Sequence, residues 1–288
     1  MSNEARLQVE HLGYRLGREW LIKDVTLDVS PGFTALTGPN GAGKTTLMRA
    51  MAGVILPTRG NIRIVGRSGP GFNPLGYIPQ FPGAYENLTG SELLLRTAWW
   101  DSPSEIRRRQ DQARAVMEAM AIGHLRNRLG RHLSPSEKRR LALAGVWMRR
   151  VQVVLWDEPT AGLDPEQRLN FWQDLYELAR LDDAPPMFLI STHLLSEVER
   201  YCDNLIIMNR GRMRHQGPVK DLIATARGHS YFVDSRDRLL TVLDTGRMDE
   251  RGYWVLAEAD RSDLRQRVPD LLDAYLWALH GQDRRRSL

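Results

Sequence analysis

The stretch GPNGAGKT at residues 38–45 restricts the fold of this chain more than any other segment. It matches G-x-x-x-x-G-K-[ST], a pattern that binds phosphate when it follows a strand and opens a helix. Both flanks agree, because the β-rich FTAL at 33–36 precedes it and TLMRAMAGV at 46–54 has helical spacing. The sequence therefore predicts a phosphate-binding loop rather than a glycine-rich turn beside a solvated lysine.

Each part of this loop has a chemical task. Glycines let successive backbone N–H groups turn toward a β-phosphate, and the helix N-terminus adds partial positive charge. Lys44 is expected to reach the β- and γ-phosphate oxygens, and the Thr45 hydroxyl is expected to bind Mg²⁺. The predicted nucleotide-binding residues of the loop are Gly38, Pro39, Asn40, Gly41, Ala42, Gly43, Lys44, Thr45 and Thr46.

A second motif, VVLWDEPT at 153–160, ends an apolar run in two carboxylates. A buried strand of this kind would deliver Asp157 to the Mg²⁺ shell and Glu158 to a water aligned on the γ-phosphate. An Asp-Glu pair alone is most often an acidic turn, but beside a phosphate loop it predicts a catalytic site. Further on, ISTHLLSE places His193 after another apolar run, where a neutral imidazole can donate to the γ-phosphate.

Strand-like and helical segments alternate along most of the chain, which predicts an α/β fold with a largely parallel sheet. Residues 91–129 are helical and charged, and we interpret them as a helical insertion. The character changes near residue 227, after which strands and a closing amphipathic helix at 268–281 predict a small α/β appendix over about 228–288. The other predicted strands are 7–12, 25–29, 61–65, 151–156 and 187–191, and a helix is predicted at 165–181.

Four segments, GPNGAGKTTLMRAMAG, YIPQ, WDEPTAGLDP and STHLLSEVERYCDNLIIMNRG, stand in the order and spacing of one family. Over residues 5–225 the chain resembles the ATP-binding subunits of ABC transporters. This resemblance implies ATP and Mg²⁺ as ligands and ATPase activity coupled to transport. It implies a P-loop NTPase core with a mainly parallel sheet, an antiparallel β subdomain and a helical subdomain at about 88–148. Residues 1–227 would then form the ATPase domain and 228–288 a small accessory domain.

The resemblance also implies roles for single residues. Tyr14 would stack on adenine, with ordinary sheet packing as the alternative. Gln80 would be a Mg²⁺ ligand and link the metal to the interface with a membrane domain. Asp164 would belong to the loop that crosses a dimer of two such subunits. Catalysis would rest on Lys44, Glu158 as the general base and His193 as the γ-phosphate sensor, and the metal ligands would be Thr45, Gln80 and Asp157.

The segment LSPSE at 133–137 departs from the family, whose signature here is Leu-Ser-Gly-Gly-Gln or Leu-Ser-Gly-Gly-Met. Pro135 removes a backbone N–H, Ser136 adds a side chain where phosphate must approach, and Glu137 adds negative charge. Ser134 and Glu137 also predict a capping box, which would satisfy the helix end internally. The signature of this chain is therefore predicted to serve a partner's γ-phosphate poorly, while its own half-site is complete.

This contrast favours a heterodimer with one strong and one weak ATP site, although a homodimer that tolerates the variant signature stays open. The basic run Lys138, Arg139 and Arg140 that follows is expected to be a mostly solvated helix face. Trp99 and Trp100, in the helical insertion, are candidate contacts for a membrane domain.

Charge, cysteine count and the length of apolar runs restrict the partners and the location that we expect for this chain. Lys and Arg number 40 against 35 Asp and Glu, a net charge of +5 that is spread along the chain, so we expect no nucleic-acid partner. The single cysteine, Cys202, fits a reducing compartment. The longest apolar run is too short to span a bilayer, and we expect a location at the cytoplasmic face of the membrane.

The tail resembles the C-terminal extension of ATPases that serve ABC-2 type exporters, whose permease is a separate chain. A soluble ABC ATPase acting on nucleic acid is the alternative function. Such chains usually carry tandem ATPase domains or long coiled coils, and a neighbouring permease gene would distinguish the two.

Overall fold

The computed structural model describes residues 6–65, 74–83, 85–96, 103–149, 151–180, 186–233, 244–249, 252–256 and 265–284. At its centre is a six-stranded sheet of strand order β5-β6-β7-β3-β8-β9. Five of these strands are parallel, and β9 runs antiparallel to β8 at one edge. The strands are β3 (Phe33–Thr37), β5 (Leu75–Ile78), β6 (Val153–Trp156), β7 (Met187–Ser191), β8 (Asn204–Asn209) and β9 (Arg212–Pro218).

The three central strands β3, β6 and β7 are buried along their whole length. This explains their continuous apolar sequences, because a parallel sheet is covered on both faces. Strand β5 begins at Leu75 and ends at Ile78, inside the YIPQ segment. That end places Gln80 just beyond the strand, at the same edge of the sheet as the residues that follow β6.

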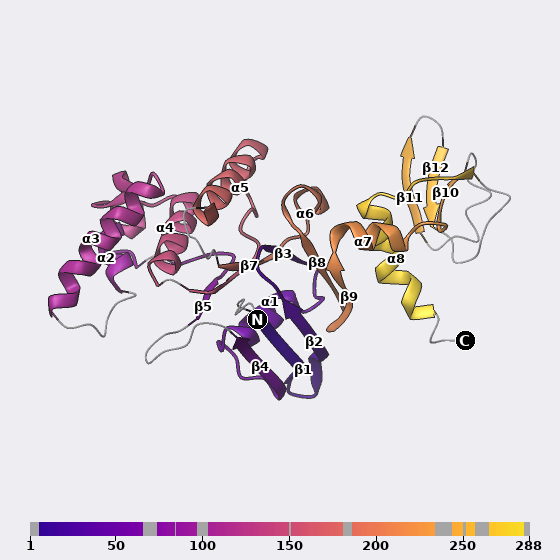
Figure 1. Ribbon diagram of the computed structural model, residues 1–288, viewed down its shortest axis with the longest axis horizontal. Coiled ribbons are helices and arrows are strands. Elements are labelled where there is room, and N and C mark those ends of the chain that lie inside the picture. The colour runs from indigo at the N-terminus through magenta and orange to yellow at the C-terminus, as the bar shows by residue number, and fades with distance from the viewer. Residues whose placement is uncertain are drawn as a thin grey trace, which may run out of the picture.

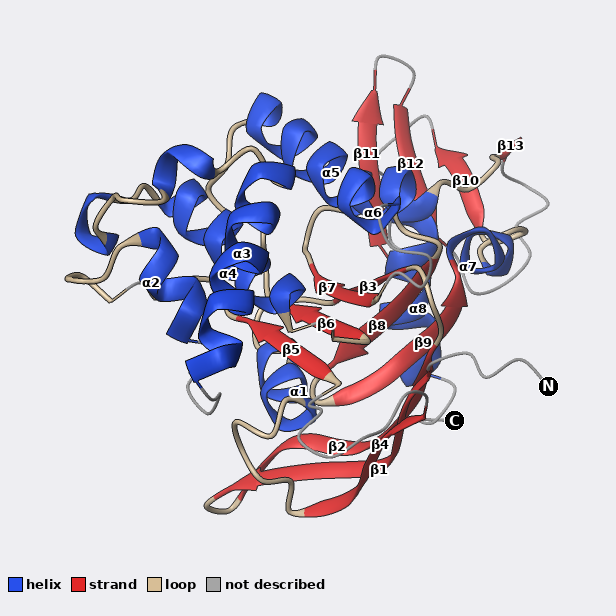
Figure 2. Ribbon diagram, turned by 60° about the vertical axis from the view of Figure 1, so that its left-hand side comes forward, coloured by secondary structure: helices blue, strands red, loops and turns tan. Residues whose placement is uncertain are grey.

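A second, three-stranded antiparallel sheet has the order β2-β1-β4. Helix α1 (Lys44–Met51) packs between it and the central sheet, as Figure 2 shows. The helix contributes Leu47 and Met48 to one buried cluster with Leu7 and Leu12 of β1 and Leu189 of β7. The loop that begins α1 is thus held between two sheets. The strands are β1 (Arg6–Leu16), β2 (Glu19–Val29) and β4 (Arg59–Val65).

The helical part lies to one side of the central sheet (Figure 1) and has a small core of its own. Leu94, Met117, Leu133 and Leu141 are among the buried residues of this core. Its elements are α2 (Gly90–Leu95), α3 (Pro103–Ala119), the short 3-10 helices η2 (Gly123–Leu125) and η3 (Gly130–His132), and α4 (Pro135–Met148). The candidate contacts Trp99 and Trp100 lie outside the described residues.

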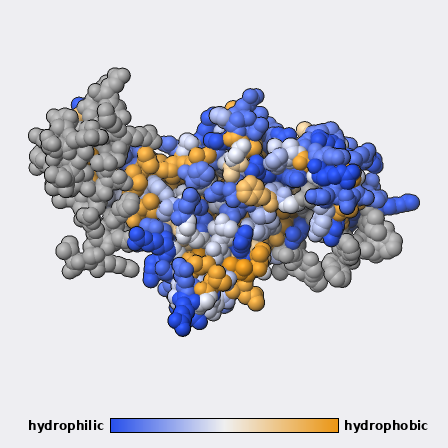
Figure 3. Space-filling view, turned by 180° about the vertical axis from the view of Figure 1, so that it is seen from behind, coloured by the Kyte–Doolittle hydropathy of each residue, from blue (hydrophilic) through white to orange (hydrophobic). Residues whose placement is uncertain are grey.

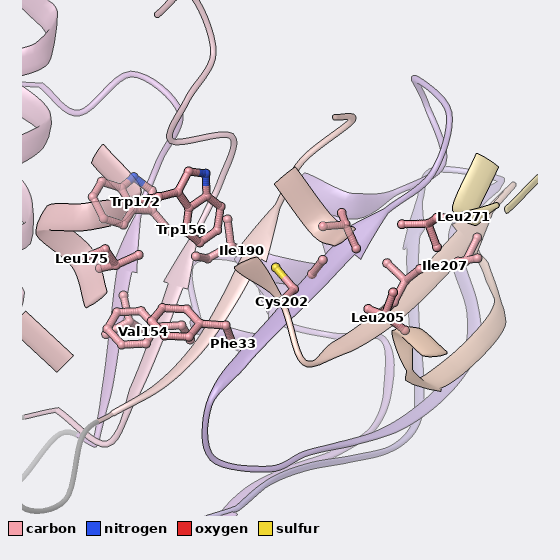
Figure 4. Packing of buried hydrophobic residues seen from close by; sticks show 14 of the residues in the cluster. Phe33, Val154, Trp156, Trp172, Leu175, Ile190, Cys202, Leu205, Ile207 and Leu271 are labelled. Atoms are coloured by element: carbon pink, nitrogen blue, oxygen red, sulfur yellow. The ribbon is translucent and has the colours of Figure 1, made fainter. Parts of the chain in front are cut away.

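Helices α5 (Pro165–Arg180), α6 (Leu195–Tyr201) and α7 (Val219–Thr225) pack on the other side of the main sheet. Trp156 of β6 and Trp172 of α5 lie in the main core cluster with Phe33 (Figure 4). Phe33 stacks on Phe188 with ring centroids 4.8 Å apart. Burial of these aromatic rings is a large part of what holds α5 against the sheet.

The C-terminal segment forms a four-stranded sheet of order β11-β12-β10-β13. Its last helix, α8 (Leu271–Arg284), packs against α7 and adds Leu271, Ala274 and Leu279 to the main core cluster. The strands are β10 (Ser230–Val233), β11 (Asp244–Asp249), β12 (Gly252–Leu256) and β13 (Arg265–Gln266). The predicted fold class is confirmed, including the parallel sheet, the antiparallel β and helical parts and the α/β appendix. The division at residue 227 stays a prediction, and the core is continuous across it.

The surface seen in Figure 3 is largely hydrophilic, with hydrophobic patches between polar residues. Within the described residues, none of the helices has the length and apolar character needed to cross a bilayer.

Candidate nucleotide-binding site

The phosphate loop joins β3 to α1 and depends on its glycines. Gly38, Gly41 and Gly43 have φ angles of 149°, 77° and 102°, a region that disfavours other residues. A Cβ on Gly38 would come within 2.2 Å of the Met208 carbonyl oxygen. The loop therefore folds tightly against β8 and leaves Asn40 and Gly41 exposed at the mouth of a cavity.

This cavity has a volume of about 530 Å³ and is lined by residues 40–46, Trp20, Lys23, Glu158 and Arg210 among others. Lys44 is only 7% exposed. Its Nζ donates to the carbonyl oxygens of Gly38 at 2.8 Å and Pro39 at 3.2 Å. Burial lowers the pKa of Lys44, and the nearby charges of Glu158 and Asp157 oppose that shift. The loop thus holds a desolvated ammonium facing two carboxylates, a charge arrangement suited to a polyanion accompanied by a cation.

Asp157 and Glu158 follow β6 and are held by Ser191 at the end of β7. The Ser191 hydroxyl donates to Asp157 Oδ1 at 2.6 Å and accepts the Glu158 N–H at 2.8 Å. Glu158 has a φ of 44°, an uncommon conformation for a residue with a side chain. Asp157 is buried, whereas the Glu158 side chain is partly exposed in the cavity. One serine from a neighbouring strand thus positions both acids.

Two further predicted residues lie beside the Glu158 carboxylate. Gln80 donates from Nε2 to Glu158 Oε2 at 3.1 Å. His193 Nδ1 lies 3.8 Å from Glu158 Oε1, and its side chain is 55% exposed. The structure therefore brings together the loop, the acid pair, Gln80 and His193, although they come from four separate parts of the sequence.

The residues present fit Mg²⁺ and a triphosphate. Thr45, Gln80 and Asp157 offer the hydroxyl, amide and carboxylate oxygens that Mg²⁺ prefers. Within the described part of the chain, no three His, Cys, Asp or Glu side chains are grouped to hold a metal. A metal here would take its other ligands from phosphate and water, which is how Mg²⁺ is commonly held beside nucleotides. The buried acid and the glycine-built loop support this assignment.

The aromatic residue that lines the cavity is not the one expected from the sequence. Tyr14 packs partly buried against the core cluster around α1 and does not line the cavity. Trp20 lines it, with the Arg59 guanidinium 5.1 Å and the Arg15 guanidinium 5.6 Å from its ring. Trp20 follows a polar turn, and no sequence signal in this chain marked it out.

Comparison with known proteins identifies the family. The family described as ABC transporter matches residues 22–161. The Nod factor export ATP-binding protein I of Ralstonia nicotianae is 32% identical over 225 residues, covering 75% of this chain and 68% of that protein. This chain belongs to the ABC transporter ATP-binding proteins.

Two further similarities agree with this family. The probable multidrug ABC transporter ATP-binding protein YbhF of Escherichia coli is 38% identical over 207 residues, which are 70% of this chain and 35% of YbhF. The chain thus spans well under half the length of YbhF. The structure of cbiO1 from Clostridium perfringens, part of the ABC transporter complex cbiONQ, has a TM-score of 0.65 at 27% identity, covering 77% of this chain and 91% of that one.

The signature segment of this ABC ATP-binding protein begins α4 and is self-capped. Ser134 Oγ accepts the Glu137 N–H at 3.2 Å, and Glu137 Oε2 accepts the Ser134 N–H at 2.7 Å. Pro135 occupies the first turn of the helix. Glu137 also pairs with Arg128 at 2.6 Å. The predicted capping box is confirmed, and two N–H groups of this helix end are already bonded within the chain.

The basic run after the signature was expected to be mostly solvated, and for one of its residues this is wrong. Arg139 is 6% exposed rather than solvated, and it donates to the Ala161 carbonyl oxygen at 2.6 Å. Arg140 forms an ion pair with Asp174 of α5 at 2.7 Å. The helical spacing of three consecutive cations turns one of them inward, and only the packing of α4 against α5 decides which one.

Asp164, expected in the dimer loop, caps α5 by accepting the Gln167 N–H at Oδ1, 2.8 Å away. Asp164, Ser134 and Ser136 lie outside the cavity of this chain.

Proposed function

We propose that this chain binds Mg·ATP at the loop of residues 38–46 and hydrolyses it. The observation that carries the proposal is the placement of Glu158 in the phosphate-loop cavity, beside Lys44 and between Gln80 and His193. A carboxylate with one oxygen near an amide and the other near an imidazole is fixed in direction, as a group that orients water must be.

In the proposed mechanism, Glu158 orients and deprotonates the attacking water. Lys44 and the backbone N–H groups of the loop stabilise the charge that develops as the β–γ bond breaks. His193 contacts the γ-phosphate and holds the carboxylate in place. Thr45, Gln80 and Asp157 would hold Mg²⁺, which would neutralise phosphate charge when bound.

We further propose that hydrolysis drives a separate membrane permease, for export. Relatives whose names refer to Nod factor export support that direction. A partner surface beside the site is supported by Phe81 and Tyr85, large apolar side chains that are 75% and 58% exposed. Because Gln80 directly precedes Phe81, a partner docked there would contact the residue that touches Glu158. The chain would then lie at the cytoplasmic face of the membrane.

Two ATPase subunits would enclose the nucleotides. The self-capped helix end and Glu137 support a heterodimer, because this signature offers a partner's γ-phosphate fewer N–H groups than two glycines would. A homodimer would place this weak signature at both sites.

The test is Glu158→Gln in the purified complex of this chain with its partner ATPase subunit and permease. Steady-state hydrolysis should be almost abolished, while ATP binding by calorimetry stays within about twofold and a nucleotide-bound dimer accumulates. Glu199→Gln, the same change at an exposed position of α6, is the matched control and should leave turnover intact. Undiminished hydrolysis in Glu158→Gln would remove this carboxylate from the mechanism.

A further inference from the structure

A second cavity, of about 440 Å³, lies between α4, α5 and the end of α3. It shares no lining residue with the phosphate-loop cavity. Its apolar wall includes Met120, Leu143 and Phe171. The volume suits a small organic molecule and is too small for a folded peptide segment.

Two buried donors in the wall of this cavity have no partner. Arg139 Nε and Trp156 Nε1 make no hydrogen bond to any described residue. Their residues are 6% and 1% exposed, so water cannot satisfy them as it does on the surface. In Figure 4 the Trp156 indole nitrogen lies on the side of the ring away from Val154 and Phe33. Leaving a buried donor unpaired is unfavourable, which marks both atoms as candidates for a ligand acceptor.

The charge of the cavity is also unbalanced. Arg140 is neutralised by Asp174 at 2.7 Å. Arg139 forms no ion pair with a carboxylate of the described residues, and its guanidinium donates to the Ala161 carbonyl oxygen. Burial lowers the pKa of Arg139. The lining also contains Glu177 and Arg180, so among the described residues it holds three arginines and two carboxylates. A buried guanidinium without a counter-charge favours an anion.

From these features we infer that this cavity binds a small organic acid with an apolar, aromatic body. Its carboxylate accepts from Arg139 Nε and Trp156 Nε1, and its body lies against Phe171 and Leu143. A cationic ligand would meet Arg139 unfavourably, and a purely apolar one would leave both donors unpaired.

The experiment is calorimetric titration of the full chain, without nucleotide, with two probes of the same skeleton and opposite charge. 4-Phenylbutyrate should bind saturably with a dissociation constant of about 0.1–1 mM, as expected for a ligand of its size. 4-Phenylbutylamine should bind at least about tenfold more weakly. Because nucleotide is absent, the outcome does not depend on the proposed ATPase.

Three variants locate the binding. Trp156→Phe keeps an aromatic side chain but removes the indole N–H together with part of the ring volume, and should weaken binding of 4-phenylbutyrate about three- to tenfold. Arg139→Met removes the charge but keeps a side chain of similar length, and should weaken binding of 4-phenylbutyrate at least about tenfold. Arg200→Met, an exposed arginine on α6, is the control and should have no effect. Circular dichroism establishes that each variant is folded.

Two results would overturn the inference. One is the absence of saturable heat for 4-phenylbutyrate up to about 5 mM, a limit well above the expected dissociation constant. The other is equal binding of acid and amine that neither Trp156→Phe nor Arg139→Met changes, which would show that the binding site lies elsewhere.

Discussion

Ser191→Ala should both destabilise this protein and slow its turnover, because one hydroxyl holds the two acids of the site. Ser191 is fully buried, donates to Asp157 and accepts from the Glu158 backbone. A hydrogen bond to a charged group contributes about 1.5–3 kcal/mol, and an orphaned buried N–H costs about 1–3 kcal/mol. Because a water could replace part of the loss, we expect the free energy of unfolding to fall by about 2–4 kcal/mol.

The effect on turnover follows from the backbone of Glu158. Its positive φ costs about 1–3 kcal/mol and persists only while neighbouring groups hold it. Without the bond to Ser191 the carboxylate can move from the water it orients, and a displacement of about 1 Å can cost about 100-fold in rate. We expect kcat to fall at least about tenfold.

The assay pairs urea unfolding with steady-state ATP hydrolysis. Ser230→Ala is the matched control, because Ser230 is also buried and donates to a carboxylate, Asp273 Oδ2 at 3.2 Å, in the C-terminal segment. Both variants should lose stability, and only Ser191→Ala should lose turnover. A Ser191→Ala protein that unfolds more easily yet keeps the parent kcat would refute the positioning role.

Three further predictions follow from the site and its surroundings. Restoring the two glycines and the glutamine of the family signature at 135–137 should strengthen ATP-driven dimerisation, measured by light scattering, and unchanged dimerisation would contradict a weakened signature. Trp20→Ala should weaken binding of ATP more than binding of inorganic triphosphate, as measured by calorimetry. If Tyr14 is instead the adenine contact, Tyr14→Ala should show this difference. Burial raises the pKa of Glu197, so the folded state keeps the proton on this carboxyl group to higher pH than the unfolded chain does. Stability therefore falls as pH rises from the unfolded pKa through the folded pKa of Glu197. Glu197→Gln should therefore stabilise the folded protein at pH 8 and much less at pH 4, and equal effects in urea unfolding at both pH values would exclude this cause.

Local sequence was sufficient to predict the elements whose structure depends only on residues close together in the sequence. The phosphate loop, the buried strand before Asp157 and the capping box of Ser134 and Glu137 each follow from residues within a few positions of one another. Asp157, Glu158 and His193 were also expected close to the phosphates that Lys44 would bind.

Contacts between distant segments could not be predicted in this way. Ser191 bonds to residues 33 and 34 positions earlier, and a serine ending a strand carries no mark of that role. Arg139 belongs to a basic run whose inward member depends on how α4 meets α5. Trp20 lines the cavity from the start of β2, and that position depends on how the antiparallel sheet of β1 and β2 lies beside the phosphate loop, which neither strand specifies alone.

The place of α8 in the core also constrains synthesis of the chain. Its Leu271 and Leu279 belong to the same buried cluster as Phe33 of β3, so this cluster joins residues that lie far apart in the sequence. A ribosome makes the N-terminal part first, so Phe33 leaves it before Leu271 and Leu279 do. Part of the apolar surface of the cluster around Phe33 therefore stays exposed to solvent until α8 has emerged and packed against it. Slow translation of the C-terminal segment would prolong that exposure and increase the demand for chaperones.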